Sequence, residues 1–312
     1  MKTTHTQVRV FVVIVNWNGK NDTLTCLSSL LSINKEKVRL HVIVVDNGST
    51  DDSVRGIQEK HPWVKMLTTG ENLGFTGGNN AGIRYALREG ADYIWLLNND
   101  TIVDKDALSI LRAFEDPGAG IAGSKIYFAP GKEYHKDRYS QSERGKVFWY
   151  AGGIIDWANM YASHRGVDAV DEGQYDRLEQ TPFITGCSMM ARRGVFEKIG
   201  VLDDRLYLYL EDVDICLRAK RHGFSLWYVP SSIVWHVNAG SSGGAGNPLQ
   251  DYYITRNRLL VGFRWAPIRT KAALLREAVR MLSGPHPIKR KAVLDAFLGK
   301  WGKQYEPKKH KN

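Results

Sequence analysis

Apolar and polar positions form long alternating blocks through the first hundred residues, and these blocks predict strands separated by helices. Four largely apolar runs rich in β-branched residues lie at 8–15, 40–46, 64–69 and 92–98. Helical spacing of apolar residues follows them, near 23–33, 51–60, 80–89 and 105–114. Continuously apolar strands joined by helices are typical of a parallel sheet covered on both faces. The pattern therefore predicts a doubly wound α/β half.

After about residue 120 the pattern becomes less regular. Strand-like segments lie near 120–126, 147–151 and 183–191, a helix is expected from about 211 to 222, and strands are expected at 225–230 and 232–237. Helical patterns then continue to the end of the chain. We expect a body over residues 1–263, divided into halves 1–119 and 120–263, and a helical extension over 264–312.

Polar residues interrupt the chain where the four predicted strands end. In open α/β sheets, ligands bind beyond the carboxyl ends of the strands, so groups at these ends are expected to converge on one site. The four groups are Asn16, Trp17 and Asn18; Asp46 with Asn47, Gly48 and Ser49; Glu71 and Asn72; and Asn98, Asn99 and Asp100.

Two of these groups have competing interpretations. The glycine-rich segment 71–82 opens a helix and brings backbone N–H groups close to a ligand, although alone it reads as a tight turn. Because it is not GxGxxG and follows the third strand, a dinucleotide fingerprint is unsupported. Asp46 can bind a ribose hydroxyl or base edge, or close an Asx-turn, and both roles are compatible.

Asp100 follows a buried apolar strand, where an unpartnered carboxylate is costly. A divalent metal bridging pyrophosphate oxygens would satisfy it, and the alternative of a helix cap suits Asp104 better. His236 ends another apolar strand; such a histidine is usually structural, but with a metal at Asp100 it is a natural further ligand that favours manganese. The glycine run at 238–246 is a candidate lid.

Three carboxylates crowd the start of the predicted helix at 211. Acidic residues there complement the helix dipole, which explains one or two of them. Glu211 or Asp212 is also a candidate general base for an acceptor hydroxyl. Asp214 and Arg218, four residues apart, are expected to form a structural ion pair.

The net charge of +10 belongs to the C-terminal extension. From Arg264 onward there are 13 Lys and Arg against 3 acidic residues, whereas the preceding 263 residues carry 30 of each. Apolar residues recur there at helical spacing, namely Ile268, Ala272, Leu275, Val279 and Leu282, and again Leu294, Phe297, Leu298 and Trp301. We favour docking to an acidic membrane surface, with packing on the body as the alternative. No nucleic-acid reading module is recognisable.

The sequence lacks a run of about 20 apolar residues and a signal-peptide core. Three widely spaced cysteines, Cys26, Cys187 and Cys216, favour small buried side chains over disulfides or a zinc site. We expect a cytoplasmic protein, peripheral at the inner face of the cytoplasmic membrane.

The combined motifs resemble glycosyltransferase family 2 with the GT-A fold, in particular its bacterial rhamnosyltransferase-like branch. The resemblance runs from about Val10 to Arg264. It rests on VIVNWNG, VVDNGSTDDS, NLGFTGGNN, LLNND, ITGCSMMARR, LYLEDVDICLR and VWH, which are specific in combination.

The resemblance implies an inverting transfer of a sugar from a dTDP- or UDP-sugar to a glycan or lipid-linked acceptor in cell-surface polysaccharide biosynthesis. It makes 1–119 the nucleotide-binding half and 120–263 the acceptor half, with Mn²⁺ or Mg²⁺ as cofactor. The implied nucleotide-binding residues are Asn16, Trp17, Asn18, Asp46, Asn72, Gly74, Gly78, Asn79, Asn98 and Asn99. Metal binding is implied for Asp100 and His236, catalysis for Asp212 with Glu211, and an acceptor or sugar pocket for Thr185, Gly186, Arg256 and Asn257. Tyr253, Arg256 and Asn257 are also implied to reach the diphosphate.

One position departs from the family pattern. Asn98 stands where the DxD motif has its first carboxylate, so the metal is expected to bind together with the nucleotide. A nucleotide-sugar-binding protein without catalysis is the alternative, and the intact Glu211-Asp212 pair argues against it. An NAD-dependent oxidoreductase is disfavoured by the missing fingerprint.

Overall fold

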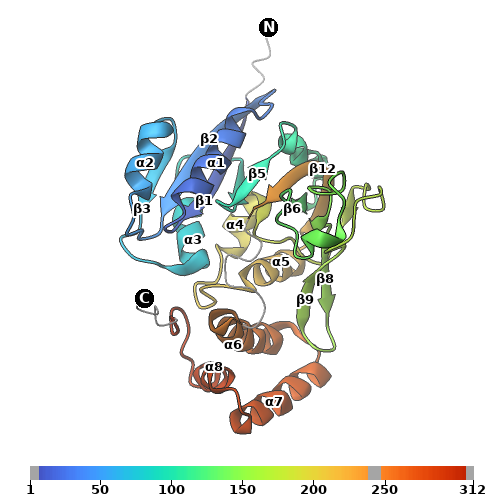
Figure 1. Cartoon of the computed structure of the whole chain (residues 1–312). Coiled ribbons are helices and arrows are strands. Elements are labelled where there is room, and N and C mark those ends of the chain that lie inside the picture. The colour runs from blue at the N-terminus through green and yellow to red at the C-terminus, as the bar shows by residue number, and fades with distance from the viewer. Residues whose placement is uncertain (1–6, 238–246, 307–312) are drawn as a thin grey trace.

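A ten-stranded mixed sheet forms the centre of the molecule in the computed structural model, which describes residues 7–237 and 247–306 (Figure 1). The strand order is β10-β12-β6-β11-β4-β1-β2-β3, with β5 paired to β12 and β7 paired to β6. The strands are β1 (Val8–Asn16), β2 (Val38–Asp46), β3 (Lys65–Thr68), β4 (Tyr93–Leu97), β5 (Thr101–Val103), β6 (Ala119–Phe128), β7 (Phe148–Tyr150), β10 (Glu179–Gln180), β11 (Ser188–Arg192) and β12 (Ser225–His236). A separate hairpin consists of β8 (Gly153–Asp156) and β9 (Tyr161–His164).

The predicted parallel half is confirmed. Strands β3, β2, β1 and β4 lie side by side and run in the same direction. The register of β1 and β2 ends with Asn16 opposite Asp46, and that of β2 and β3 with Asp46 opposite Thr68. The polar residues after these strands therefore begin at the same level of the sheet.

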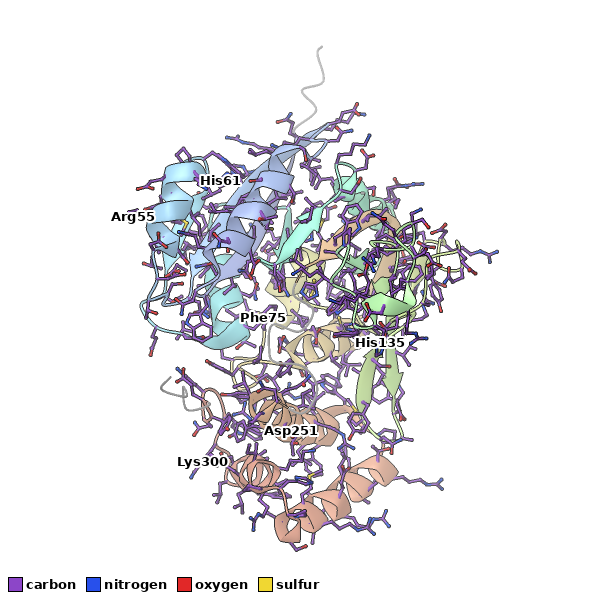
Figure 2. The ribbon with its side chains drawn as sticks, in the orientation of Figure 1. Arg55, His61, Phe75, His135, Asp251 and Lys300 are labelled. Carbon is purple, nitrogen blue, oxygen red and sulfur yellow. The ribbon has the colours of Figure 1, made fainter. Side chains whose placement is uncertain are left out.

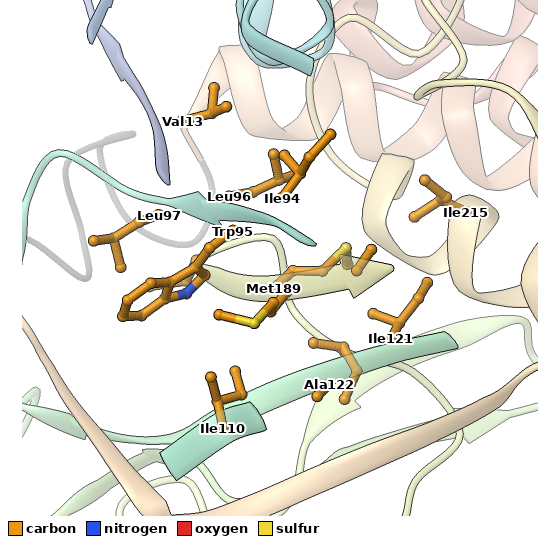
Figure 3. Packing of buried hydrophobic residues seen from close by; sticks show 14 of the residues in the cluster. Val13, Ile94, Trp95, Leu96, Leu97, Ile110, Ile121, Ala122, Met189 and Ile215 are labelled. Atoms are coloured by element: carbon orange, nitrogen blue, oxygen red, sulfur yellow. The ribbon is translucent and has the colours of Figure 1, made fainter. Parts of the chain in front are cut away.

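Buried side chains from both faces explain why these strands are continuously apolar. Trp95, Leu96 and Leu97 of β4 pack with Met189 of β11 and Ile121 of β6 in the middle of the sheet (Figure 3). Because each face is covered, residues pointing in either direction are buried, and the alternation of a half-exposed strand is lost.

Helices cover this sheet. They are α1 (Lys20–Leu31), α2 (Ser53–Lys60), α3 (Gly74–Arg88), α4 (Arg193–Ile199) and α5 (Glu211–Arg221), with the 3₁₀ helix η1 (Ala107–Glu115). A short 3₁₀ helix, η2 (Lys136–Arg138), lies between β6 and β7 in the chain. The helix expected at 105–114 is thus a 3₁₀ helix, closed by bonds such as that from Ser109 N to Asp106 O (2.9 Å). Helix α3 begins at Gly74, six positions before the expected start at 80.

The second half of the chain completes the sheet. Strand β11 runs antiparallel to both β4 and β6, while β6 and β12 are parallel to each other. The two strands expected at 225–230 and 232–237 are one strand, β12, whose register shifts between Val229 and Ile233. Pro230 lies at this shift, because proline has no N–H for the ladder yet its dihedral angle suits an extended chain.

The C-terminal helices α6 (Pro248–Trp265), α7 (Ile268–Ser283) and α8 (Pro287–Phe297) contact one another. Figure 1 shows α7 and α8 at the end of the molecule opposite the N-terminus. Helix α6 runs through the boundary at 263–264, so the division into body and extension stays a prediction. Within residues 7–237 and 247–306, no helix has the length and apolarity needed to span a membrane.

The predictions for the cysteines and one ion pair are confirmed. Cys26, Cys187 and Cys216 are free and buried. Arg218 Nε donates to Asp214 Oδ2 at 2.8 Å, and the fully buried Asp214 carboxylate also accepts from Arg264 and Trp265. The Asp214 carboxylate therefore has a structural role, holding α5 against Arg264 and Trp265.

Candidate active site

Asn16 connects the ends of the first two strands. Its Nδ2 donates to Asp46 Oδ1 and to Ser49 Oγ, each at 3.0 Å, and its Oδ1 accepts from Thr23 Oγ1 at 2.8 Å. Asp46 Oδ2 also accepts from the backbone N–H of Ser49 (3.1 Å), three residues on, whereas an Asx-turn would use the N–H two residues on. Asn16 is fully buried and Asp46 nearly so, so both side chains are held rigidly at this edge.

Trp17 and Asn18 follow directly. Asn18 has a left-handed backbone (φ 52°), and its Oδ1 accepts from Thr50 N at 2.8 Å. This bond fixes the turn after β1 against the turn after β2. The Trp17 side chain is 47% exposed, so a large aromatic surface is available beside the buried Asn16–Asp46 pair.

Asn47 joins the second strand to the start of α3. Its Nδ2 donates to Asn72 Oδ1 (3.2 Å) and to Gly74 O (3.0 Å), while its Oδ1 accepts from Leu73 N (3.1 Å). The third predicted polar group is thereby bonded to the second. Asn79 lies one turn further along α3 and donates from Nδ2 to Phe75 O (2.9 Å).

Glycines let α3 approach its neighbours. Gly74 has φ 73°, and a Cβ there would lie 2.5 Å from the carbonyl oxygen of Tyr207. A Cβ on Gly78 would lie 2.8 Å from the Val15 side chain. Close packing therefore accounts for both glycines whether or not a diphosphate binds at this helix start.

The fourth polar group is bonded to the first and to β12. Asn99 Nδ2 donates to Thr23 Oγ1 (3.1 Å), the hydroxyl that also contacts Asn16. Asp100 Oδ1 lies 3.1 Å from His236 Nε2, and both side chains are almost completely buried. Asn98 is held at the same turn, since its N–H donates to Cys187 O (3.0 Å). All four strand ends thus converge, as the sequence predicted.

Asp100 and His236 have the chemistry of a divalent metal site. The described residues contain no cluster of three His, Cys, Asp or Glu side chains suited to a metal, so an ion at this pair would need further ligands. Their separation of 3.1 Å matches neighbouring ligands of an ion whose bonds are about 2.1 Å long. His236 Nδ1 is buried and has no partner among the described residues. The pair therefore fits two ligand positions of a divalent ion.

Glu211 and Asp212 are the first two residues of α5, which begins beside the turn that precedes β11. Asp212 Oδ2 accepts from the N–H of Gly186 (3.1 Å) and Oδ1 from that of Val213 (2.8 Å). Burial raises the pKa of Asp212, against the opposing effect of these backbone donors. Burial, with the charge of Asp212 added, raises the pKa of Glu211 well above its usual range. Glu211 Oε2 has no partner among the described residues.

The turn before Glu211 is strained. Tyr207, Tyr209 and Leu210 all have left-handed backbones, with φ of 64°, 70° and 68°. Such a conformation costs a residue that is not glycine about 1–3 kcal/mol. Strain of this kind persists only where the surroundings enforce it, so this turn needs strong support.

Arg256 and Asn257 of α6 supply that support. Asn257 Nδ2 donates to the carbonyl oxygens of Leu206, Leu208 and Tyr209 at 2.8–2.9 Å. Arg256 Nη2 donates to the carbonyls of Arg205 and Leu206, each at 3.0 Å, and both side chains are fully buried. These contacts differ from the pocket position that the sequence suggested, because the side chains bind the backbone of residues 205–209. Tyr253 likewise donates from its hydroxyl to Tyr305 O (3.0 Å).

Gly186 is the meeting point of the two halves. A Cβ there would lie 3.1 Å from the Phe75 ring at the start of α3 and 3.7 Å from Cβ of Asp212. Figure 2 labels Phe75 between α3 and α5. The neighbouring Thr185 is buried, and its Oγ1 accepts from Cys187 N at 3.4 Å. Since Cys187 O accepts from Asn98 N, the turn 185–187 connects the Asp212 side to the Asp100 side.

Three residues that the sequence did not single out complete this network. Thr23 bridges Asn16 and Asn99, and its signal was a hydroxyl in the first turn of the helix after β1. Phe75 lies against Gly186. Trp149 of β7 packs edge-on against His236, with ring centroids 4.5 Å apart, and nothing in its local sequence indicated that.

Known proteins resemble this chain in sequence. The model of "Glycosyl transferase family 2" matches residues 11–200. The chain is 30% identical over 221 residues to an N-acetylglucosaminyl-diphospho-decaprenol L-rhamnosyltransferase of Mycobacterium tuberculosis, covering 65% of this chain and 68% of that protein. It is 26% identical over 267 residues to the dTDP-rhamnosyl transferase RfbF of Shigella flexneri, covering 81% and 79%.

Solved structures share the fold. The mannosyltransferase PcManGT of Pyrobaculum calidifontis, solved with GDP-Man and Mn²⁺, has a TM-score of 0.54 at 17% identity and covers 93% of this chain and 74% of its own. GalNAc-T7, solved with UDP, GalNAc and Mn²⁺, has a TM-score of 0.60 at 15% identity and covers 87% and 55%. These likenesses concern the fold, which is GT-A. The chain belongs to glycosyltransferase family 2, and its relatives include bacterial rhamnosyltransferases.

Proposed function

We propose that this glycosyltransferase is an inverting, metal-dependent enzyme that transfers a hexose-type sugar from a nucleotide diphosphate to a glycan or lipid-linked acceptor. Its main support is the position of Asp100 and Asp212 on either side of the turn 185–187, at the carboxyl end of β4. A base for the acceptor and a site for the departing diphosphate must flank one sugar, and this arrangement supplies both.

The donor side is formed by the ends of the parallel strands. We assign the nucleotide to Asn16, Asp46 and the exposed Trp17 ring, and the diphosphate to the start of α3 and to Asn98–Asp100. The positive end of the helix dipole at the start of α3 favours an anion. The names of two relatives, an L-rhamnosyltransferase and a dTDP-rhamnosyl transferase, favour dTDP-rhamnose as the donor over a UDP-sugar.

Asp212 acts as the base in a single displacement. Its carboxylate takes the proton of the acceptor hydroxyl while that oxygen forms a bond to the anomeric carbon. The bond from this carbon to the diphosphate oxygen breaks on the opposite face, so the configuration inverts. Two backbone donors orient the Asp212 carboxylate, and its raised pKa makes it a stronger base than an ordinary aspartate.

Glu211 helps by holding its proton more strongly than an ordinary glutamate. Because burial and the charge of Asp212 raise the pKa of Glu211 well above its usual range, the negative charge of the pair is favoured on Asp212. On the opposite side, a divalent ion held by Asp100 and His236 would neutralise charge on the diphosphate as it leaves. Asn98 adds no charge there, which suits an ion that binds together with the nucleotide.

The proposed setting is the inner face of the cytoplasmic membrane, in the synthesis of a cell-surface polysaccharide. The name of one relative, an N-acetylglucosaminyl-diphospho-decaprenol L-rhamnosyltransferase, supports a lipid-linked acceptor.

A donor screen tests the proposed function. The chain is heated with dTDP-rhamnose, UDP-hexoses and UDP-N-acetylhexosamines, each with Mn²⁺, because a ligand raises the unfolding temperature of the state it binds. We expect dTDP-rhamnose to give the largest increase. Donor hydrolysis or transfer is then followed, and the product linkage is read by NMR. Retention of the anomeric configuration would contradict the displacement, and binding without turnover would leave only a nucleotide-sugar-binding protein.

A further inference from the structure

The outer faces of α7 and α8 expose rows of large apolar side chains. On α7, Ile268, Leu275 and Val279 are 79%, 47% and 58% exposed. On α8 and directly after it, exposure is 49% for Leu294, 50% for Phe297 and 66% for Leu298. These residues recur at the spacing of one helix face. Scattered apolar residues on a surface are ordinary, but rows along two adjacent helices are not.

The inner faces of the same helices already pack on the body. Thr270 donates to Trp157 O at 2.8 Å, and the Leu274 side chain fills the space above Gly262 of α6. Arg258 of α6 pairs with Glu277 at 2.8 Å, and Ala278 is buried. The sequence left two alternatives, membrane docking and packing on the body. In the structure, the residues of α7 that pack on the body lie on a different face of the helix from Ile268, Leu275 and Val279.

The second helix has the same division. Ala292 and Val293 are buried, and Tyr252 of α6 donates to Asp295 Oδ2 at 2.6 Å. Trp301, which the sequence placed in the apolar row, instead packs its ring against the Arg256 guanidinium, 5.7 Å from the ring centroid. Leu294, Phe297 and Leu298 are therefore the residues left outside.

Positive charge borders the rows. Arg269, Arg276 and Arg280 are exposed and lie on one flank of the α7 row, as their spacing of seven and four residues requires. Arg290 is exposed on α8. The acidic residues of the two helices, Glu277 and Asp295, are paired on the inner faces. The outer surface thus combines apolar rows with basic side chains.

We propose that the outer faces of α7 and α8, called here the basic apolar face, dock on a bilayer surface that contains anionic lipids. Charge and apolarity together identify this occupant. A bilayer presents anionic headgroups directly above an apolar interior, which matches arginines beside an apolar row on a helix lying in the membrane plane. A nucleic acid would attract the arginines but leave the apolar rows exposed to water.

This docking rests on the proposed function in one respect, since it would bring the enzyme to a lipid-linked acceptor. It predicts the orientation of the protein. Figure 1 shows α7 and α8 at one end of the molecule, with the sheet on the far side of α6. The donor site would therefore be held above the membrane.

Flotation of the full chain with vesicles tests the basic apolar face. We expect binding to phosphatidylcholine vesicles that contain about 30% phosphatidylglycerol, little binding to phosphatidylcholine alone, and release between about 0.05 M and about 0.5 M salt, since salt screens surface charge. The triple variant Ile268→Ser, Leu275→Ser, Val279→Ser is expected to bind at least about tenfold more weakly than the wild type.

The charged flank is tested with a matched control. Arg269→Gln, Arg276→Gln and Arg280→Gln together are expected to weaken binding by at least about tenfold. The control removes three exposed arginines elsewhere, Arg55, Arg84 and Arg88, by the same substitution. It changes net charge equally, so loss of binding in the control as well would show attraction by overall charge and contradict docking through this face.

Other outcomes separate docking from function. Transfer to a soluble acceptor is expected to be unchanged in both triple variants. Vesicle binding without any transfer would leave docking intact and remove the proposed function. The docking proposal would be overturned if both triple variants bound vesicles as well as the wild type does. It would also be overturned by stronger binding to a DNA or RNA oligomer than to vesicles, or by self-association through α7 that vesicles do not relieve.

Discussion

The N–H of Gly186 donates a hydrogen bond to Oδ2 of Asp212 at 3.1 Å. This contact joins two segments 26 positions apart in the chain: the turn that enters β11 and the first turn of α5. Because Cys187 O also accepts from Asn98 N, a displacement of Gly186 would disturb both sides of the site.

Gly186→Ala is expected to impair turnover more than donor binding. The added Cβ would lie 3.1 Å from the Phe75 ring, so the ring or the turn must give by a few tenths of an ångström, and a shift of the turn lengthens the bond to Asp212. We expect kcat to fall by roughly 10- to 100-fold, since small displacements of a catalytic group are costly. Gly194→Ala is the matched control, because a Cβ there meets nothing within 4 Å. Equal effects on both variants would argue against a special role for Gly186.

Asn257→Ala should reveal the support of the strained turn. The carbonyls of Leu208 and Tyr209 would lose this donor, whereas that of Leu206 would keep its bond from Arg256 Nη2, and we expect a loss of about 1–3 kcal/mol in the free energy of unfolding. Since Asn257 acts through the turn before Glu211, kcat should fall while the KM for the donor stays nearly constant. Steady-state kinetics separate the two parameters. A large increase in donor KM with unchanged kcat would instead favour direct contact with the diphosphate, as the sequence had suggested.

Glu211→Gln is expected to change how stability depends on pH. Burial raises the pKa of Glu211 well above its ordinary value of 4.5, so the folded protein keeps a proton that the unfolded chain has lost. The stabilising contribution of this group is therefore complete below pH 4.5 and is lost as the pH rises toward the folded pKa. The free energy of unfolding of the variant should fall less than that of the wild type as the pH rises. The stability of the variant relative to the wild type should therefore be greater at neutral pH than at pH 4.5. Urea unfolding across the pH range measures it, and an unchanged slope would contradict the raised pKa.

Removing one metal ligand tests the Asp100–His236 pair without measuring turnover. Titration calorimetry with Mn²⁺ in the presence of dTDP should show binding by the wild type. Asp100→Asn and His236→Ala are each expected to weaken it by at least about tenfold. Asp104→Asn, just after β5, is the control. Undiminished Mn²⁺ affinity in both ligand variants would place the ion elsewhere.

Much of the donor side could be predicted because it follows from local pattern and sheet geometry. Apolar runs predicted β1 to β4, and ligands bind beyond the carboxyl ends of such strands, so Asn16 and Asp46 could be assigned to one site, where the structure shows them hydrogen-bonded. The structural ion pair of Asp214 and Arg218 followed from helical spacing in the same way.

The contacts that support the strained turn before Glu211 could not be predicted. The segment LYLYL at 206–210 contains no glycine or asparagine, so nothing local signalled three left-handed residues. Its stabilising partners, Arg256 and Asn257, lie about 50 positions later and bind backbone carbonyls, which leave no mark on side-chain pattern. The early start of α3 was missed because glycine disfavours helices, whereas here close packing against Val13 and Val15 requires it. The proposed lid at 238–246 lies outside the described residues.

The most direct test of the central claim is transfer by Asp212→Asn with the donor identified in the screen. Asparagine keeps the size of the side chain and removes its basicity. We expect kcat to fall by about a hundredfold or more while donor affinity, measured by calorimetry, changes little. Near-normal turnover in this variant would contradict the assignment of Asp212 as the base, and with it the proposed mechanism.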